Sequence, residues 1–336
     1  MYLDYLNSTI VPKITEPIKV LDLFAGCGGL SLGFEAAGFE TIGFEMVDAA
    51  VDTYNKNLFG TCYNQMLSVG YSFPDSESID IIIGGPPCQP FSRSGSQKGV
   101  KDTRDGFPIF IDAIARLRPK VFLFENVANL LGRHKWYFDQ VVKELRDLGY
   151  LVDFRILNAK DFGVPQNRER LITVGHKSSF TFPKRDTRYV TVGEAIGDTM
   201  NSFDDKSKFL TPAQDAYIAN YEAKSKCINP RDLYADRPAR TLTCRNLAGA
   251  TSDMHRVRLP DGRRRRITVS EAARLQSFPD FFEFCGTEDK QFNQIGNAVP
   301  PIFAYKLAIS LKETYYKEEI SADKIKAINK MNEPLL

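Results

Sequence analysis

The segment 84–95, GGPPCQPFSRSG, contains the residue with the clearest chemical potential, Cys88. Cys88 follows the β-branched run 79–83 and two prolines, and a loop of Ser, Gly, Gln and Lys residues follows it. A lone cysteine is most often a small buried apolar residue. The stiff prolines before Cys88 and the polar loop after it instead favour a nucleophilic thiolate at the tip of a rigid turn.

Two further motifs offer an acid and two cations. Glu125 follows the apolar run 120–124, KVFLF, where partial desolvation would raise the pKa of its carboxyl group toward that of a usable acid. A helix-capping or core carboxylate is the alternative. Arg168 and Arg170 of QNRER could hold an anionic group or a carbonyl. The alternative for the arginines is a structural ion-pair network, and we expect one of them to belong to it.

A glycine-rich loop, AGCGG at 25–29, follows the apolar run 18–24 and precedes a predicted helix. Its glycines allow a sharp turn and close approach to a ligand, and the helix N-terminus offers free N–H groups. Glu45, at the end of the next apolar run, could bind ribose hydroxyls. Ser31 occupies the third glycine position of a dinucleotide fingerprint, so the loop favours a nucleoside-type ligand over NAD. A plain tight turn is the alternative.

These motifs must be positioned by alternating strands and helices. The apolar and amphipathic segments predict an α/β fold with a doubly wound, mainly parallel, Rossmann-like sheet. In such sheets, sites form at the carboxyl ends of the strands, so Cys88, Glu125 and the loop 25–29 should converge on one crevice. The predicted strands are 18–24, 40–46, 79–83, 120–124, 150–157 and 171–175, and the predicted helices are 30–37, 48–58, 107–117 and 137–148.

The alternation ends near residue 180. Residues 180–268 are richer in Thr, Asp, Pro and Arg and predict a second, smaller module with irregular or β structure. Helical patterning returns at 270–276 and 300–316, and the Lys/Glu-rich tail 312–330 predicts an exposed helix. The length of 336 residues also suggests two domains.

Composition excludes several classes of protein. No apolar run could span a bilayer, the start shows no signal-peptide pattern, and the six cysteines form no CxxC pair. We therefore expect a cytoplasmic protein with no membrane association, no metal and no disulfide framework. The net charge is only +2, but residues 231–266 carry ten arginines against four aspartates, or +6, and the rest of the chain carries −4. This window predicts contact with phosphates, and a solvated turn is the alternative for RRRR at 263–266.

Taken together, the motifs resemble those of the bacterial-type DNA (cytosine-5)-methyltransferases. The matching blocks run between residues 20 and 301 in the order found in that family: DLFAGCGGLSLGFEAAGF, GGPPCQPFSRSG, FENV, QNRER, EAARLQSFPD and QIGNAVPP. The resemblance implies a methyltransferase that depends on S-adenosylmethionine. It also implies a catalytic and cofactor-binding domain at 1–180, a target recognition domain at 181–285, and a segment, 286–336, that returns to the catalytic domain.

The resemblance assigns S-adenosyl-L-methionine as methyl donor and S-adenosyl-L-homocysteine as product. Phe24 would pack on the adenine, the loop residues Ala25, Gly26, Cys27, Gly28 and Gly29 would hold the methionine part, and Glu45 would bind the ribose. Relatives often have Trp at the position of Met46, and Asn64 stands near a position where they have an Asp-Ile pair that accepts from the adenine amino group. The remaining cofactor residues implied are Pro87, Asn297 and Val299.

The same resemblance implies that Cys88 adds to C6 of a cytosine and activates C5 for methylation. Glu125 would act at N3, Arg170 would hold O2, and Arg168 would support the site electrostatically. The cytosine must first be flipped out of the duplex. The loop 89–104 would serve as a lid. The expected DNA contacts are Ser92, Ser94, Gln97 and Lys98 in this loop, with Arg240, Thr243, Arg245, Arg256, Arg258, Arg263 and Arg264.

Three other functions stay open from the sequence. A transfer-RNA cytosine-5 methyltransferase uses the same scaffold, and a catalytically silent DNA-binding regulator would keep the DNA contacts alone. A Rossmann oxidoreductase would give no reason for PPCQPFS. We expect a prokaryotic or phage monomer that acts on a short palindrome-like site in double-stranded DNA, with a cognate restriction endonuclease as a candidate partner.

Overall fold

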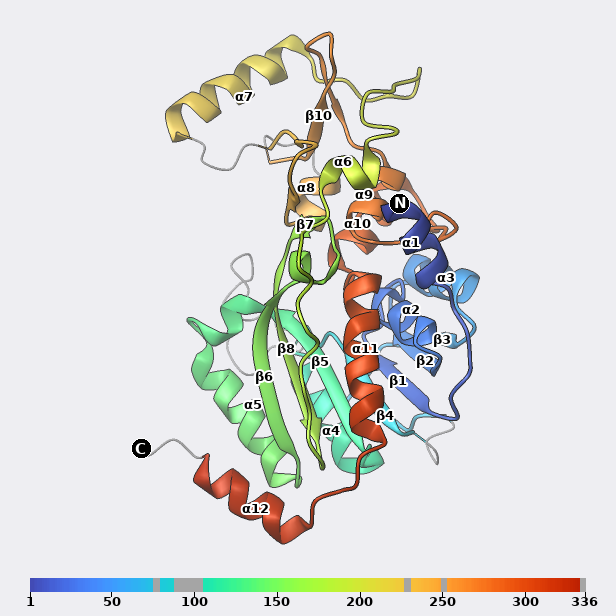
Figure 1. Cartoon of the computed structure of the whole chain (residues 1–336), viewed down its shortest axis with the longest axis vertical. Helices are drawn as coiled ribbons and strands as arrows, with labels where there is room; N and C mark the ends of the chain where they lie inside the picture. Colours follow the sequence, from blue (N-terminus) through green and yellow to red (C-terminus); the bar gives the residue numbers. More distant parts are fainter. Residues whose placement is uncertain (75–78, 88–104, 227–230, 249–252, 333–336) are drawn as a thin grey trace.

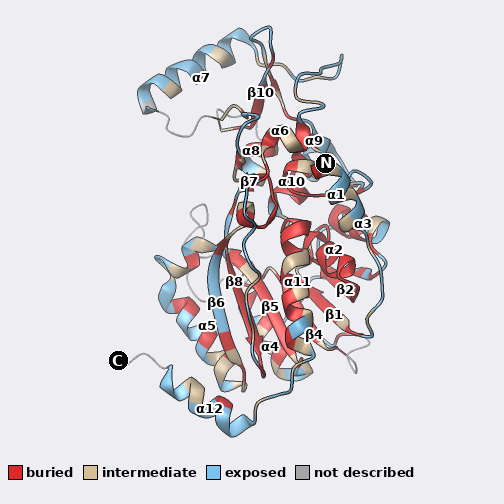
Figure 2. Cartoon of the chain, viewed as in Figure 1, coloured by how far each residue is buried: buried red, intermediate tan, exposed pale blue. Residues whose placement is uncertain are grey.

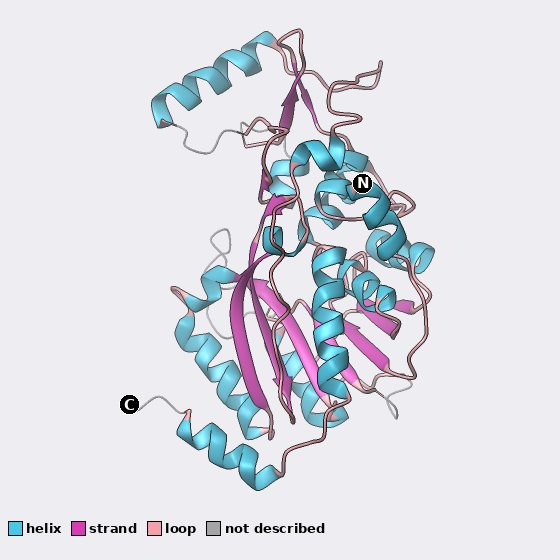
Figure 3. Ribbon diagram, in the orientation of Figure 1, coloured by secondary structure: helices cyan, strands magenta, loops and turns pink. Residues whose placement is uncertain are grey.

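The computed structural model describes residues 1–74, 79–87, 105–226, 231–248 and 253–332. Within these residues, one seven-stranded sheet forms the centre of the molecule, with the strand order β3-β2-β1-β4-β5-β8-β6 (Figures 1 and 3). Its strands are β1 (Lys19–Leu23), β2 (Glu40–Glu45), β3 (Thr61–Asn64), β4 (Ile81–Gly84), β5 (Val121–Val127), β6 (Leu151–Asn158) and β8 (Glu169–His176).

The first five strands in this order are parallel, and β8 runs antiparallel between β5 and β6. The prediction of a doubly wound, mainly parallel sheet is therefore confirmed. β3 was not predicted, because its sequence, TCYN, has no apolar run, and only Cys62 among its four residues is buried.

Helices cover both faces of the sheet, as the alternation of buried side chains requires. On one face, Val20 and Ile83 join a core with α2 (Gly29–Ala36), α3 (Asp48–Asn57) and α11 (Pro301–Tyr315). On the other face, Leu21 and Phe122 pack with α4 (Phe107–Leu117) and α5 (Lys135–Asp147). Figure 2 shows the resulting buried interior between the two helix layers.

The segment after β8 extends beyond one end of the sheet (Figure 1). α7 is a surface helix there, although irregular or β structure was predicted. Its residues show no apolar periodicity, but Thr211 caps it by accepting a hydrogen bond from the Gln214 N–H, and Pro212 occupies its first turn. The elements of this segment are α6 (Val192–Ile196), α7 (Pro212–Ser225), β9 (Ala239–Arg240), α8 (Cys244–Ala248), β10 (Arg256–Arg258), β11 (Arg264–Arg266), α9 (Val269–Leu275) and α10 (Glu288–Asn297).

The remaining elements lie at the ends and in the connections. The predicted helical tail is two helices, because α11 ends at Tyr315 and α12 (Ala322–Met331) begins after a short break. The others are α1 (Tyr2–Thr9), η4 (Ala128–Leu131), η5 (Ala159–Phe162) and β7 (Gln166–Asn167), which pairs with β9. Among the described residues, no helix has the length and apolar character needed to cross a membrane.

The packing of α2 on α11 depends on a glycine. A Cβ atom on Gly33 would lie 2.5 Å from Ala304 Cβ and 2.5 Å from the Tyr305 backbone nitrogen. Gly33→Ala should therefore lower the free energy of unfolding by about 2 kcal/mol, because a rigid helix backbone must move. Urea denaturation of this variant measures the change. Gly85→Ala is the control, because no atom lies within 4 Å of the corresponding Cβ position, and an equal loss in both variants would contradict the prediction.

Candidate active site

The register of the parallel strands brings the predicted site residues to one edge of the sheet. Leu23 on β1 pairs with Gly84 on β4, and Gly84 pairs with Phe124 on β5. The residue after each of these three therefore stands at the same carboxyl edge: Phe24, Gly85 and Glu125. This arrangement is the one predicted for Glu125 and the glycine-rich loop.

The loop after β1 has an unusual backbone path. Phe24 has φ 63°, and Gly26 and Gly28 have φ 56° and 86°. A bulky residue in the left-handed region costs on the order of 1–3 kcal/mol, and such strain is found where the surrounding structure fixes the conformation. The turn thus fixes the backbone from which the partly buried Phe24 ring projects.

Glu45 fastens this loop to the end of β2. Its carboxylate accepts hydrogen bonds from the backbone N–H groups of Gly26 (3.0 Å), Met46 (2.9 Å) and Val47 (3.0 Å). The space beside Gly26 is open, since no atom lies within 4 Å of the position of a Cβ. The Glu45 carboxylate therefore lies next to the open space beside Gly26.

The remaining predicted cofactor residues have different environments. A Cβ on Gly29 would lie 2.5 Å from the carbonyl oxygen of Val299, so Val299 packs directly on the loop. Asn297 is an exposed residue at the end of α10, and Met46 is also exposed. The side-chain nitrogen of Asn64 donates a hydrogen bond to Asp48, which orients the amide whose carbonyl oxygen is the predicted adenine acceptor.

Glu125 and Arg170 form an ion pair at the carboxyl edge. The distance from Arg170 Nε to Glu125 Oε1 is 2.6 Å, and the two side chains are only 14% and 13% exposed. The next residue, Asn126, donates from its side-chain amide to the carbonyl oxygen of Pro86 at 3.0 Å, which ties β5 to the segment before Cys88. A carboxyl group and a guanidinium are thereby held beside the end of β4.

Arg168 has a structural role, and the electrostatic support predicted for it stays a prediction. Its guanidinium is buried and donates to the carbonyl oxygens of Leu242 (2.8 Å), Gly296 (3.3 Å) and Ala298 (3.0 Å). Burial, and then the nearby charge of Arg170, lowers the pKa of Arg168 well below its usual value. Arg168 is therefore the structural arginine that we expected QNRER to contain, and it binds backbone rather than an ion-pair network.

Comparison with known proteins agrees with this geometry. The family model of the C-5 cytosine-specific DNA methylases matches residues 18–313. The chain belongs to this family. It is 55% identical to the type II methyltransferase M.AplI of Arthrospira platensis, over 93% of this chain and 91% of that protein. It is 34% identical to the type II methyltransferase M.FnuDI of Fusobacterium nucleatum, over 90% and 96%.

Solved structures share the fold of this methyltransferase at lower identity. A mutant of DNMT2 from Spodoptera frugiperda superimposes with a TM-score of 0.65 and 18% identity, covering 89% of this chain and 100% of that one. The Entamoeba histolytica methyltransferase EhMeth gives a TM-score of 0.64 and 18% identity, covering 90% and 100%. The predicted enzyme class is thus confirmed: the chain is a DNA (cytosine-5)-methyltransferase.

The cysteines of the methyltransferase differ in environment. Cys88 and the predicted loop contacts Ser92, Ser94, Gln97 and Lys98 lie outside the described residues. Cys27 and Cys62 are buried, and desolvation raises the pKa of both thiols, that of Cys27 to about 12. These two are neutral packing residues at neutral pH, as expected. The Cys27 thiol lies 3.8 Å from the carbonyl oxygen of Gln294, so the cofactor contact predicted for Cys27 would come from its backbone.

Several arginines predicted to bind DNA are structural. Arg256 is fully buried, with Nε 2.5 Å from Asp232 and Nη2 2.8 Å from Glu222. Arg264 is largely buried between Asp215 and Asp232, at 2.8 and 3.0 Å. Arg240 pairs with Asp253 at 3.2 Å. Burial excludes Arg256 from the DNA contact predicted for it, because its guanidinium lies inside the methyltransferase.

The positive charge of 231–266 is therefore smaller at the surface than its +6 suggests. Two of the carboxylates that neutralise it, Asp215 and Glu222, come from α7, and Glu271 pairs with Arg265 at 2.7 Å. The described arginines that keep exposed side chains are Arg237, Arg245, Arg258 and Arg263. Thr243 lies at the start of α8, where its hydroxyl accepts from the Asn246 N–H at 3.4 Å.

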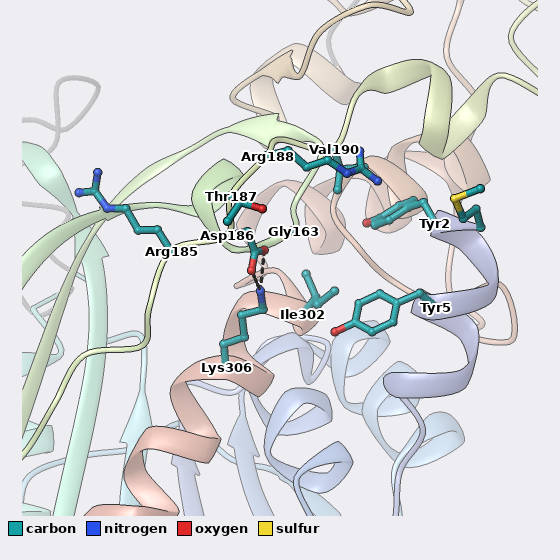
Figure 4. A pocket seen from close by; sticks show the side chains of 11 residues that line it. Tyr2, Tyr5, Gly163, Arg185, Asp186, Thr187, Arg188, Val190, Ile302 and Lys306 are labelled. Atoms are coloured by element: carbon teal, nitrogen blue, oxygen red, sulfur yellow. Dashed lines mark hydrogen bonds and ion pairs between the residues drawn. The ribbon is translucent and has the colours of Figure 1, made fainter.

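A cavity of about 440 Å³ lies away from the carboxyl edge, between α1, residues 185–190 and α11 (Figure 4). Its charged side chains are already paired: Lys306 with Asp186 at 2.5 Å, and Arg188 with Glu194 at 2.8 Å. None of the predicted catalytic or cofactor residues lines it. Among the described residues, no group of three His, Cys, Asp or Glu side chains could hold a metal ion.

Asp22 on β1 is a buried acid that the sequence analysis missed. Its carboxylate accepts a hydrogen bond from the Ser31 hydroxyl at 2.6 Å, so the serine at the third glycine position has a structural partner. Desolvation raises the pKa of Asp22 to about 7. The available sequence signal was its place inside the apolar run 18–24, which predicts a buried strand.

The raised pKa of Asp22 predicts a dependence of stability on pH. The folded state holds a proton that the unfolded chain releases near pH 4, so this contribution is full below pH 4 and is lost as pH rises through about 7. In the wild type the loss should approach about 4 kcal/mol. Asp22→Asn should remove it, because the amide does not titrate. Urea unfolding of both proteins between pH 4 and 8 gives the difference, and parallel curves would contradict the prediction.

The buried position of Arg256 predicts a large effect on stability. Arg256→Met should lower the free energy of unfolding by about 3 kcal/mol or more, because Asp232 and Glu222 would lose a buried partner. Arg258→Met, on the same strand, is the matched control. Arg258 is 55% exposed and lies 3.5 Å from Asp232, so its loss should cost under about 1 kcal/mol. Equal losses in thermal or urea unfolding would contradict the assignment.

Proposed function

We propose that this methyltransferase transfers a methyl group from S-adenosyl-L-methionine to C5 of a flipped cytosine in a short sequence of duplex DNA. It would be the modification enzyme of a type II restriction-modification system, with Cys88 as nucleophile. The observation that carries the proposal is the Glu125–Arg170 pair at the edge where the strand before Cys88 ends. The names of the relatives, which are type II methyltransferases, support the biological assignment.

The residues of the glycine-rich loop fit the proposed cofactor. The open space beside Gly26 adjoins the carboxylate of Glu45, which suits ribose hydroxyls, and the Phe24 ring offers an apolar surface for adenine. Val299 packs on the loop, and Gly28 and Gly29 leave no room for side chains there. When bound, S-adenosyl-L-methionine supplies an electrophilic methyl group on a sulfonium centre.

The catalytic residues would act on the cytosine ring in order. The Cys88 thiolate forms a bond to C6, and the electron pair displaced from the C5–C6 double bond is stabilised as Glu125 gives a proton to N3. Arg170 holds O2 with its guanidinium while its Nε keeps Glu125 in place. C5 would then take the methyl group, with S-adenosyl-L-homocysteine as the leaving group. Water or hydroxide removes the C5 proton, the Cys88–C6 bond breaks with its electron pair returning to sulfur, and N3 gives its proton back to Glu125, which regenerates the ring.

DNA recognition would fall to the segment 181–285, which extends beyond the sheet (Figure 1). Arg245, Arg258 and Arg263 keep exposed side chains there and are the best candidates for contact with phosphates or bases. The enzyme would act as a monomer on a short palindrome-like site, because one small recognition module has limited reach. A cognate restriction endonuclease that cuts the unmethylated site would be its functional partner.

Replacing the nucleophile tests the chemistry. Cys88→Ala should reduce methyl transfer to duplex DNA by at least about 10³-fold, because the alanine cannot add to C6. Tritium transfer from labelled S-adenosyl-L-methionine measures activity, and gel-shift titration should show unchanged DNA affinity. Cys285→Ala is the control, since the backbone N–H of Cys285 donates to Thr53 and its carbonyl oxygen accepts from Gln294, contacts that an alanine keeps, and this variant should keep wild-type activity. Turnover by Cys88→Ala would contradict the assignment.

The same assay distinguishes the proposed substrate from its alternative. Duplex DNA carrying varied sites should accept the methyl group, and transfer RNA should not. Bisulfite sequencing of DNA from cells that produce the protein would then identify the modified cytosine. Transfer to RNA alone would overturn the DNA assignment, and binding without transfer to either would favour a silent regulator.

A further inference from the structure

A buried hydrogen-bonded pair, Asp105 and Tyr137, lies beneath the proposed cofactor site. The Tyr137 hydroxyl on α5 donates to Oδ2 of Asp105, and Oδ1 of the same carboxylate accepts from the Phe107 N–H at 3.1 Å. Both residues are buried. The carboxylate therefore joins α5 to the start of α4 inside an aromatic core.

Gly106, which stands between Asp105 and Phe107 in the sequence, packs on two predicted cofactor residues. Its N–H donates to the carbonyl oxygen of Pro87 at 2.9 Å. A Cβ atom at Gly106 would lie 2.4 Å from Pro87 Cδ and 3.0 Å from Phe24 Cζ, so the backbone approaches both rings closely. The position of Gly106 thus limits where Phe24 and Pro87 can sit.

The aromatic core also connects Tyr137 to the carboxyl edge of the sheet, where Glu125 stands. The Phe107 ring lies 5.8 Å from the Tyr137 ring and 5.3 Å from the Phe124 ring, centroid to centroid. Phe124 directly precedes Glu125 on β5. Tyr137 is therefore connected by one packed ring to the strand that carries the proposed acid.

We propose that Asp105 and Tyr137 are positioning residues that hold Gly106 against Phe24 and Pro87 and so shape the adenine side of the cofactor site. Neither residue would touch the cofactor. This inference rests on the proposed use of S-adenosyl-L-methionine. Its physical basis is that a carboxylate fixed by two donors fixes the backbone that carries it, and the Phe24 ring then has one supporting surface.

Kinetics on the full-length enzyme test the pair. Tyr137→Phe keeps the ring and removes the donor to Asp105, so KM for S-adenosyl-L-methionine should rise about tenfold while kcat at saturating cofactor stays within about twofold. The dissociation constant of S-adenosyl-L-homocysteine, measured by calorimetry, should rise in parallel. KM for DNA should not change. Asp105→Asn, which keeps an acceptor for the Phe107 N–H and can bond to the tyrosine, should retain most of the affinity, whereas Asp105→Ala should not.

Tyr150→Phe is the matched control. The Tyr150 hydroxyl is also buried in this core and donates to the carbonyl oxygen of Pro119 at 2.6 Å, but Pro119 precedes β5 at the opposite end of that strand. This variant should lose thermal stability comparably to Tyr137→Phe and keep the wild-type KM for the cofactor.

Three results would overturn the inference. These are an unchanged KM for S-adenosyl-L-methionine in Tyr137→Phe, an equal rise in KM in Tyr150→Phe, and a fall in kcat without a change in KM. If the wild-type protein binds no S-adenosyl-L-homocysteine, the proposed function itself fails, and this result is distinct from a failure of the pair.

Discussion

The buried guanidinium of Arg168 holds together three segments that are distant in the sequence. Arg168 lies between β7 and β8. Its guanidinium donates to the carbonyl oxygens of Leu242, before α8, and of Gly296 and Ala298 at the end of α10. Because all three acceptors are backbone carbonyls, the contact depends on the path of the chain and not on the side chains at those positions. Any shift of one segment would leave a buried cation or carbonyl without a partner, which is costly in a low-dielectric interior.

The side chains of Gln166 and Gln276 connect the same segments by further hydrogen bonds. The Gln166 side chain donates to the Leu275 carbonyl oxygen at 3.1 Å and accepts from the Leu242 N–H at 2.9 Å. Gln276 donates to the Ala298 carbonyl oxygen at 2.6 Å. A Cβ on Gly296 would lie 2.2 Å from the Cys244 nitrogen, so α10 and α8 meet at backbone distance. The segment beyond the sheet is consequently attached rigidly to the chain that borders the glycine-rich loop.

The sequence was most informative where local pattern decides structure. Apolar runs located the starts of β1, β4 and β5 within two residues, and the shared edge of Phe24 and Glu125 follows from parallel strands alone. The predicted bounds of α4, 107–117, also match the helix found. At these positions burial and backbone propensity agree, so a short window contains enough information.

The sequence was least informative where partners come from distant segments. The sequence shows that Arg256 is cationic, but it does not show that Glu222 and Asp232 are its ion-pair partners, which only the folded structure identifies. The role of Arg168 depends on carbonyls more than 70 residues away. Tyr137 resembles any other apolar-face residue of an amphipathic helix until Asp105 is placed against it. Residue type limited the possible roles, and tertiary contact selected among them.

The arginines of 231–266 consequently belong to two sets with different tolerance to change. Arg256, Arg264 and Arg265 form buried ion pairs with carboxylates and stabilise the segment; they are the structural set. Arg245 and Arg258 project from that framework without being needed to build it. Because Arg245 and Arg258 are the proposed DNA contacts, a change of DNA sequence preference can be sought by randomising these two positions while the structural set is kept. The library then samples altered contacts on one unaltered scaffold.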